Sequence, residues 1–110
     1  MFAKNLISLV LALASLSFVH AAQAGAYHQT GKIRDLSITN NGLLVKFEPA
    51  LPDNCEDTPY GWMVVKQEDT ALTSALLALY ISDRLSGTIY TKPPENGTKY
   101  CSVSQFHPAK

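Results

Sequence analysis

The chain of 110 residues has little charge, few cysteines and no long apolar run after its first twenty residues. It has 9 lysines and arginines against 9 aspartates and glutamates, and charged residues make up 16% of it. A balanced charge argues against a nucleic-acid binder, because such proteins hold phosphates with an excess of basic side chains. The length allows one domain, and an apolar fraction of 46% is typical of a globular chain.

Signatures of catalysis are missing as well. The sequence contains no HExxH, no GxSxG and no glycine-rich phosphate loop. His28 and His107 lie near the two ends of the segment 25–110, where a closed barrel can bring them together, but we interpret them as exposed side chains. The acidic cluster from Asp53 to Asp57 lacks the glycine and the distal glutamate of a calcium-binding EF-hand loop. We therefore expect a protein that is not an enzyme, with no catalytic residue, no metal and no cofactor.

The first 24 residues have the features of a secretory signal peptide. Lys4 supplies the positive n-region, Leu6 to Val19 form the apolar h-region, and Ala22-Gln23-Ala24 fits the small-x-small cleavage rule. The alternative is a membrane anchor, for which the apolar run is short. We expect cleavage after Ala24, a single mature domain of residues 25–110 without a membrane anchor, and a periplasmic or secreted location in a bacterium.

Cys55 and Cys101 are the only cysteines, and both remain after that cleavage. Exported chains meet an oxidising compartment, so we expect one disulfide bond between them. The alternative is a pair of free thiols. A bridge that closes so long a loop stabilises the fold by roughly 4 kcal/mol in the chain-entropy treatment, which is a large contribution for a small core.

Strand patterns dominate the mature chain. We expect strands at residues 32–39, 43–48, 60–66, 88–92 and 99–106, and a proline-rich loop at 49–59. The inward parity of the first strand switches between Ile33 and Leu36, which predicts a bulge near Arg34 and Asp35. Asn41-Gly42 predicts a type I′ hairpin turn after this strand.

Residues 70–84 have helical rather than strand periodicity. Their leucines recur on one helical face, and Asp69 or Thr70 can cap the first turn. Leu77 and Ile81 spread the apolar surface beyond a single stripe. The helix is therefore either deeply buried in a small barrel or in contact with another chain. For the second case, Leu77 and Ile81 are the candidate subunit-interface residues.

The order of three strands, one helix and two strands is that of an OB-fold, a five-stranded Greek-key barrel. A long, bent first strand serves both sides of such a barrel, and the helix closes one end. The main alternative is a flat α+β sheet with one packed helix. We predict a mainly β, OB-fold-like barrel with a helix at about 70–84 and a Cys55–Cys101 disulfide.

Aromatic and basic side chains indicate where a ligand would bind. OB-folds bind ligands on strands two and three and the adjoining loops. Tyrosine and tryptophan combine a flat apolar face with a polar tip, which suits sugar or peptide recognition. We predict a binding site that contains Lys46, Tyr60, Trp62 and Lys66, although Trp62 has a place in the core as its alternative. The same residue types can stack single-stranded nucleic acid, but export and the balanced charge argue against that ligand.

The whole pattern resembles small exported OB-fold proteins of bacteria, akin to the binding subunits of subtilase-cytotoxin and pertussis-type toxins. The resemblance is carried by GxIxxLxIxNxG at residues 31–42, the loop cysteine Cys55, aromatic residues in the third strand, ALLALY at 75–80, and Cys101. In that class five copies form a ring and bind glycans on host cells. The resemblance implies a homo-oligomeric binding module, and it assigns no sugar-contact residue to this chain.

We therefore expect an exported, non-catalytic binding module whose partner is a glycan or an exported protein. The first alternative is an envelope inhibitor or accessory protein that docks on an exported enzyme. The second is a small hydrolase, for which the sequence shows no pairing of a nucleophile with a base.

Overall fold

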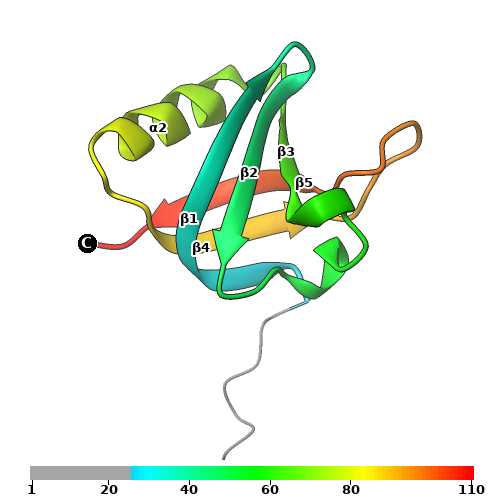
Figure 1. Ribbon diagram of the computed structural model, residues 1–110, viewed down its shortest axis with the longest axis horizontal. Helices are drawn as coiled ribbons and strands as arrows, with labels where there is room; N and C mark the ends of the chain where they lie inside the picture. The colour runs from blue at the N-terminus through cyan, green and yellow to red at the C-terminus, as the bar shows by residue number, and fades with distance from the viewer. Residues whose placement is uncertain (1–25) are drawn as a thin grey trace, which may run out of the picture.

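The structure, a computed structural model, describes residues 26–110, so the expected signal peptide lies outside the described residues. Three strands, one helix and two further strands follow each other along the chain (Figure 1). The elements are β1 (His28–Thr39), β2 (Gly42–Glu48), η1 (Asp53–Cys55), η2 (Pro59–Gly61), β3 (Met63–Lys66), α2 (Thr70–Ile81), β4 (Ser86–Lys92) and β5 (Ser102–Pro108). The described part of the chain is mainly β, and none of its helices has the length and apolarity needed to cross a bilayer.

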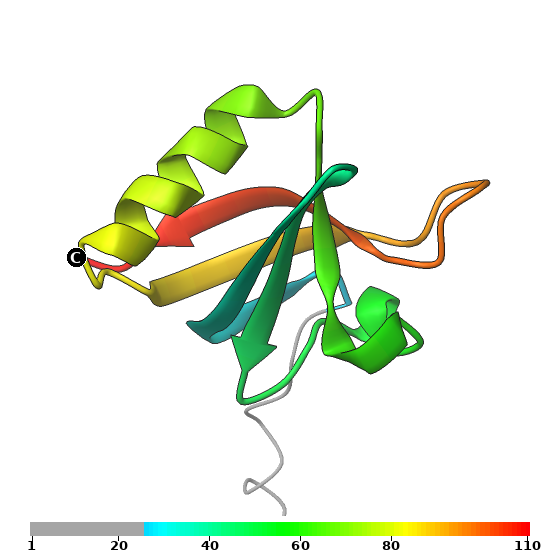
Figure 2. The ribbon, with the colours of Figure 1, turned by 45° about the horizontal axis from the view of Figure 1, so that its top comes forward.

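The five strands close into a barrel in the order β1-β2-β3-β5-β4 (Figure 2). β1 pairs antiparallel with β2 on one side and with β4 on the other. β3 pairs antiparallel with β2, and parallel with β5 through Val64 and Ser102. The ring of pairings leaves no flat sheet, so the α+β alternative is wrong for residues 26–110.

β1 joins the two halves of the barrel because it changes partner along its length. Residues His28 to Lys32 pair with β4, and Lys32 to Thr39 pair with β2. The register shifts between Ile33 and Asp35, which confirms the predicted bulge. The strand starts four residues earlier than predicted. The first four residues of β1 are polar or glycine, so sequence periodicity gives no strand signal there.

Gly31 faces Gly87 of β4 where β1 changes partner. A Cβ atom at Gly31 would overlap the carbonyl oxygen of Glu48 and the ring of Phe47. Gly31→Ala is therefore expected to lower the free energy of unfolding by about 1–3 kcal/mol, as overpacking of a rigid interior does. Urea denaturation measures this loss, with the exposed neighbour Lys32→Ala as the control. Equal stability of the two variants would show that the backbones do not approach this closely.

The barrel interior is filled by the alternate residues of each strand and by one helix residue. In β2, Leu43, Val45 and Phe47 point inward, as predicted. Leu76 is fully buried and is the only buried residue of α2. The helix therefore covers one end of the barrel with one fully buried side chain and leaves part of its surface outside, so of the two alternatives for this helix deep burial is wrong.

α2 ends at Ile81 rather than at Arg84. Asp83 adopts a left-handed conformation with φ 58°, and the amide of Arg84 donates to the carbonyl of Leu79. The Ser82 hydroxyl also donates to the carbonyl of Ala78 at 2.7 Å. No glycine marks this stop in the sequence, which is why periodicity extends the predicted helix three residues too far.

The β1–β2 hairpin is confirmed, but its turn differs from the prediction. Thr39 pairs with Gly42, so the two central residues are Asn40 and Asn41 rather than Asn41 and Gly42. Neither asparagine has a positive φ, so the turn is not type I′. The Thr39 hydroxyl takes part instead: it donates to the Gly42 carbonyl at 2.7 Å and accepts from the Asn41 amide at 3.2 Å.

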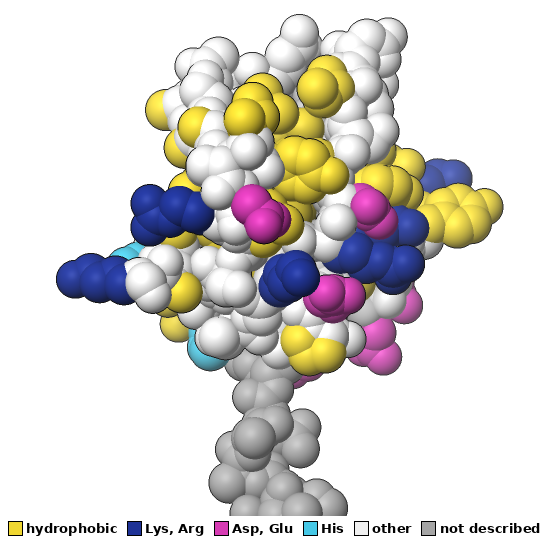
Figure 3. Space-filling model, turned by 60° about the vertical axis from the view of Figure 1, so that its left-hand side comes forward, with side chains coloured by type: hydrophobic (Ala, Val, Ile, Leu, Met, Phe, Trp, Pro, Cys, Tyr) yellow, Lys and Arg dark blue, Asp and Glu magenta, His cyan; other side chains and the backbone are white. Residues whose placement is uncertain are grey.

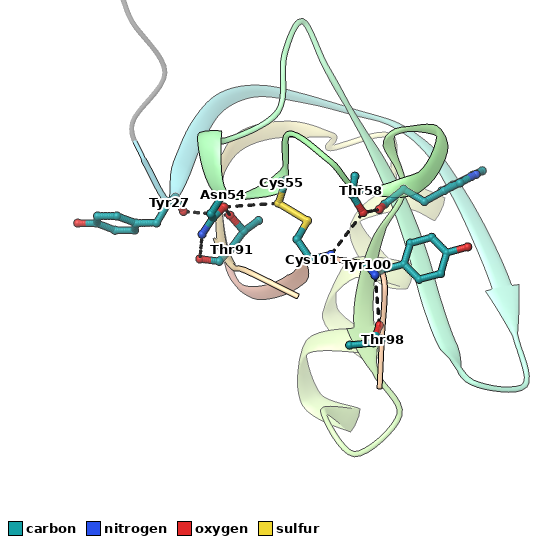
Figure 4. The surroundings of a disulfide bond; sticks show 9 residues. Tyr27, Asn54, Cys55, Thr58, Thr91, Thr98, Tyr100 and Cys101 are labelled. Carbon is teal, nitrogen blue, oxygen red and sulfur yellow. Dashed lines mark hydrogen bonds between the residues drawn. A yellow bond between two sulfur atoms is a disulfide. The ribbon is translucent and has the colours of Figure 1, made fainter. Parts of the chain in front are cut away.

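The predicted disulfide joins Cys55 and Cys101, whose Cα atoms are 5.3 Å apart (Figure 4). Both residues are fully buried. The bridge ties the loop after β2 to the residue that precedes β5, and Asn54 adds side-chain hydrogen bonds to Thr91 of β4. The segment 49–59, expected to be plain loop, contains the 3-10 turn η1 and the first residue of a second one, η2.

Candidate functional site

A groove of about 1010 Å³ crosses the outer face of β2 and β3. One wall comes from η2, the other from the loop between β4 and β5, and the β1–β2 hairpin closes one end. The lining residues are Thr39, Asn41, Leu44, Pro59, Tyr60, Val64, Lys66, Gln67, Glu68, Glu95, Gly97, Thr98, Lys99, Tyr100 and Ser102. The floor of the groove thus lies on the two strands that the sequence analysis selected, whereas the wall from the β4–β5 loop was not expected.

Strand alternation builds the floor of this groove. Leu43 and Val65 point into the barrel, so the next pair in register, Leu44 and Val64, points outward and is only half-buried. Lys66 follows at the end of β3 on the same outer face. The floor is therefore mildly apolar at its centre and charged at one end.

Tyr60 stands on the first wall in an unusual backbone conformation. Its φ is 53° and its ψ is 19°, the left-handed region that non-glycine residues avoid. Its side chain is 88% exposed, so no packing within the domain compensates for this conformation. Strained residues of this kind concentrate at binding sites, which makes the Tyr60 ring the leading candidate for ligand contact.

Hydrogen bonds hold the backbone on both sides of Tyr60. The Gly61 amide donates to the Thr58 carbonyl, and the Trp62 amide donates to the Pro59 carbonyl at 3.0 Å. The buried Thr58 hydroxyl donates to the Trp62 carbonyl and accepts from the Cys101 amide (Figure 4). The ring of Tyr60 is thus presented on a fixed turn rather than on a free loop.

Tyr100 belongs to the opposite wall and is half-buried. Its amide donates to the Thr98 hydroxyl at 3.2 Å, and the Thr98 amide donates to the Glu95 carbonyl. Tyr100 is next to Cys101, and η2 follows Cys55 after a short turn. The disulfide therefore ties both tyrosine-bearing walls to each other.

An ion pair spans the charged end of the groove. Lys66 Nζ lies 2.7 Å from Glu95 Oε1, which links β3 to the β4–β5 loop. The hydrogen bond to Glu95 raises the pKa of Lys66, and the same bond lowers the pKa of Glu95. Both groups therefore stay ionised near neutral pH. With Lys99 and Glu68 also on the lining, the groove carries two charges of each sign.

The structure divides the four predicted ligand-binding residues into two pairs. Tyr60 and Lys66 both line the groove. Lys46 Nζ lies 4.6 Å from the centre of the Trp62 ring, and this cation–π pair lies outside the lining. Trp62 is half-buried and is not a member of the core cluster.

Two predicted strand boundaries shift at this site. β3 starts at Met63 rather than at residue 60, because Tyr60 and Gly61 both have positive φ in η2. β5 starts at Ser102 rather than at residue 99, since the preceding residues form the groove wall.

The sequence analysis did not include Tyr100 and Asn41 among the site residues. The position of Tyr100 beside a disulfide cysteine was the signal in the sequence.

A second aromatic surface lies on the outer face of β1 and β4. The rings of Tyr27 and His28 are 5.1 Å apart, and that of Tyr90 lies 5.8 Å from His28 and 6.3 Å from Tyr27. Tyr27 is 58% exposed. The sequence analysis did not identify this aromatic cluster.

The histidines do not meet. His28 pairs in register with Tyr90, and His107 pairs with Thr88, so β4 separates them. His107 is exposed, as predicted, whereas His28 is half-buried within the aromatic cluster. In residues 26–110 no three His, Cys, Asp or Glu side chains gather in a way that suits a metal ion.

No family model, no curated protein and no solved structure matches this chain. The chemistry of the groove is therefore the guide to function. It offers two tyrosine rings, amide and hydroxyl groups from Asn41, Gln67 and Thr98, and a fixed ion pair. Such a surface can hold a polar ligand that has both apolar faces and hydroxyl groups.

Proposed function

We propose that this chain is an exported, non-catalytic binding module built on an OB-fold, and that its groove binds an oligosaccharide. The strand order, the parallel β3–β5 pair and the helix between β3 and β4 support the OB-fold. The buried disulfide supports a periplasmic or secreted location, because such bonds persist in oxidising compartments.

The observation that carries the proposal is the exposed, conformationally strained Tyr60 at the rim of the groove. The C–H face of a sugar ring packs against an aromatic ring, and its hydroxyls bond to amide and charged groups. Asn41 lies at one end of the groove, and the Lys66–Glu95 pair lies along it. A chain of sugars can therefore contact the ring and these polar groups together.

Glu95 of the groove is better suited to binding than to donating a proton in hydrolysis. Glycoside hydrolysis uses two carboxyl groups, one of which has a raised pKa and donates a proton to the leaving group. Glu95 has the opposite property, since its hydrogen bond to Lys66 lowers its pKa. It is therefore a hydrogen-bond acceptor for sugar hydroxyls and a poor general acid.

The Tyr60→Ala variant tests the proposal. The exported chain is applied to an array of neutral and sialylated oligosaccharides, and the best binder is titrated by calorimetry. Loss of the stacking ring is expected to weaken binding about tenfold or more, which corresponds to roughly 1.4 kcal/mol. Tyr27→Ala is the matched control, because it removes an exposed tyrosine outside the groove.

Two results would contradict this proposal. Binding that survives Tyr60→Ala but is lost in Tyr27→Ala would place the sugar on the aromatic cluster of β1 and β4. Silence across the array, together with co-purification of an exported enzyme, would instead favour a protein-docking role.

A further inference from the structure

We propose that the outer face of α2 is a twofold interface, on which a second copy of this chain packs its own α2 in the antiparallel direction. The groove proposed to bind sugar contains no residue of α2, so this inference goes beyond that function and stands or falls independently.

The face is apolar and uncharged. None of the twelve residues of α2 is charged, and only Leu76 is buried. Ile81 is 84% exposed, and Ala71, Ala75 and Ala78 are exposed with it. Figure 3 turns the α2 side of the molecule towards the viewer and shows hydrophobic side chains above a belt of charged ones. A helix face without charge, on a chain that surrounds it with charge, is typical of an interaction surface.

The spacing on this face matches a helix–helix seam. A helix advances about 100° per residue, which places residues 71, 74, 78 and 81 on the side opposite Leu76. Steps of three, four and three residues are the a and d spacing at which two helices interlock their side chains. On the inner side, Leu72 and Leu77 pack with Leu76 against the core. α2 thus has two apolar faces, and the barrel covers one.

The pattern of the seam favours a second copy over another partner. In an antiparallel pair with a twofold axis near residue 76, Ala71 faces Ile81 of the other copy, and Ser74 faces Ala78. A large side chain thus meets a small one at each end, and two small ones meet at the centre, where the backbones can approach. A twofold contact requires such a self-complementary surface.

The charges at the helix ends set the direction. Glu68 and Asp69 precede α2, and Asp83 and Arg84 follow it, so its first end is acidic and its last end has no net charge. An antiparallel pair brings the acidic end of each helix to the neutral end of its partner, where Glu68 faces Arg84, whereas a parallel pair brings two acidic ends together. The helix dipoles also oppose each other only in the antiparallel arrangement.

A hollow beside the helix enlarges the contact. It measures about 250 Å³ and lies between the β1–β2 hairpin and α2, with Ile38, Leu43 and Leu77 on its walls. Ile38 is 78% exposed. A helix of twelve residues is only about 18 Å long, so even with Ile38 the interface is small by the standards of stable dimers. We therefore expect a dimer that dissociates in the micromolar range.

Sedimentation of the exported chain between about 1 and 200 µM tests this inference. The wild-type chain is expected to pass from monomer to dimer, and Ala78→Glu is expected to raise the dissociation constant at least tenfold, because it places a charge at the centre of the seam. Ala109→Glu is the matched control, since it makes the same change at an exposed residue outside α2. Circular dichroism establishes that both variants remain folded.

A cross-linking experiment tests the direction of the helices. A Ser74→Cys chain mixed with an Ala78→Cys chain is expected to give a mixed disulfide-linked dimer in preference to either self-linked product. A wild-type chain that stays monomeric, a dimer that survives Ala78→Glu, or an assembly of five copies would overturn the inference. Unchanged oligosaccharide binding by folded Ala78→Glu would keep this result separate from the proposed function.

Discussion

Replacement of both cysteines by alanine is expected to lower the free energy of unfolding by roughly 4 kcal/mol. The bridge links residues 46 positions apart, so it removes a large amount of conformational entropy from the unfolded chain. A small barrel has little other stabilisation in reserve. Both cysteines are also fully buried, and their removal leaves unfilled space in the core.

Urea denaturation of the Cys55→Ala, Cys101→Ala double variant measures this loss. Addition of reductant should destabilise the wild-type chain to a similar degree and leave the variant unchanged, which serves as the control. A midpoint for the double variant within error of the wild type would mean that the bridge does not restrain the unfolded chain.

The same bridge links stability to binding. It ties the turn that presents Tyr60 to the segment that carries Tyr100. At a temperature where the reduced chain is still folded, we therefore expect weaker oligosaccharide binding without any change in the groove's side chains. The cause would be a wider range of separations between the two walls.

Leu76→Ala is expected to cost about 2–5 kcal/mol, the range for truncation of a fully buried leucine. Leu76 is the only fully buried side chain of α2, so it is the main contact of the helix with the barrel interior. Loss of this anchor leaves a cavity at the end of the barrel and frees the helix to detach.

Leu77→Ala is the matched control for this prediction. Leu77 is adjacent in sequence and only half-buried, so its truncation should cost clearly less. Urea midpoints measured at dilute protein, below the expected dimer range, compare the two variants. Equal losses for Leu76 and Leu77 would mean that α2 does not use Leu76 as its anchor.

Periodicity and cysteine usage predicted much of this fold from the sequence. Alternation in residues 43–48 identified the inward face of β2, and the parity switch after Ile33 identified the bulge in β1. The disulfide was predicted from the expected export signal and the count of two cysteines, and the structure confirms the pairing. These features depend on local pattern or on simple chemistry, and a single sequence contains both.

The missed features depend on contacts between distant segments. The left-handed conformation of Tyr60 has no local signal, because tyrosine in such a segment normally indicates a strand. The groove forms where η2 meets a loop that follows β4 in the sequence, so Tyr100 could not be joined to Tyr60 by spacing. In the hairpin turn, hydrogen bonds of the Thr39 side chain stand in place of the positive φ angles that Asn41-Gly42 predicted.

Amide chemical shifts during a titration test the account most directly. The ¹⁵N-labelled chain of residues 25–110 is titrated with the strongest oligosaccharide from the array. We predict that the largest shifts belong to Asn41, Tyr60, Lys66 and Tyr100, and that they trace the groove from the hairpin to the β4–β5 loop. Shifts confined to Tyr27, His28 and Tyr90, or no shifts at saturating oligosaccharide, would contradict the assignment of the groove as the binding site.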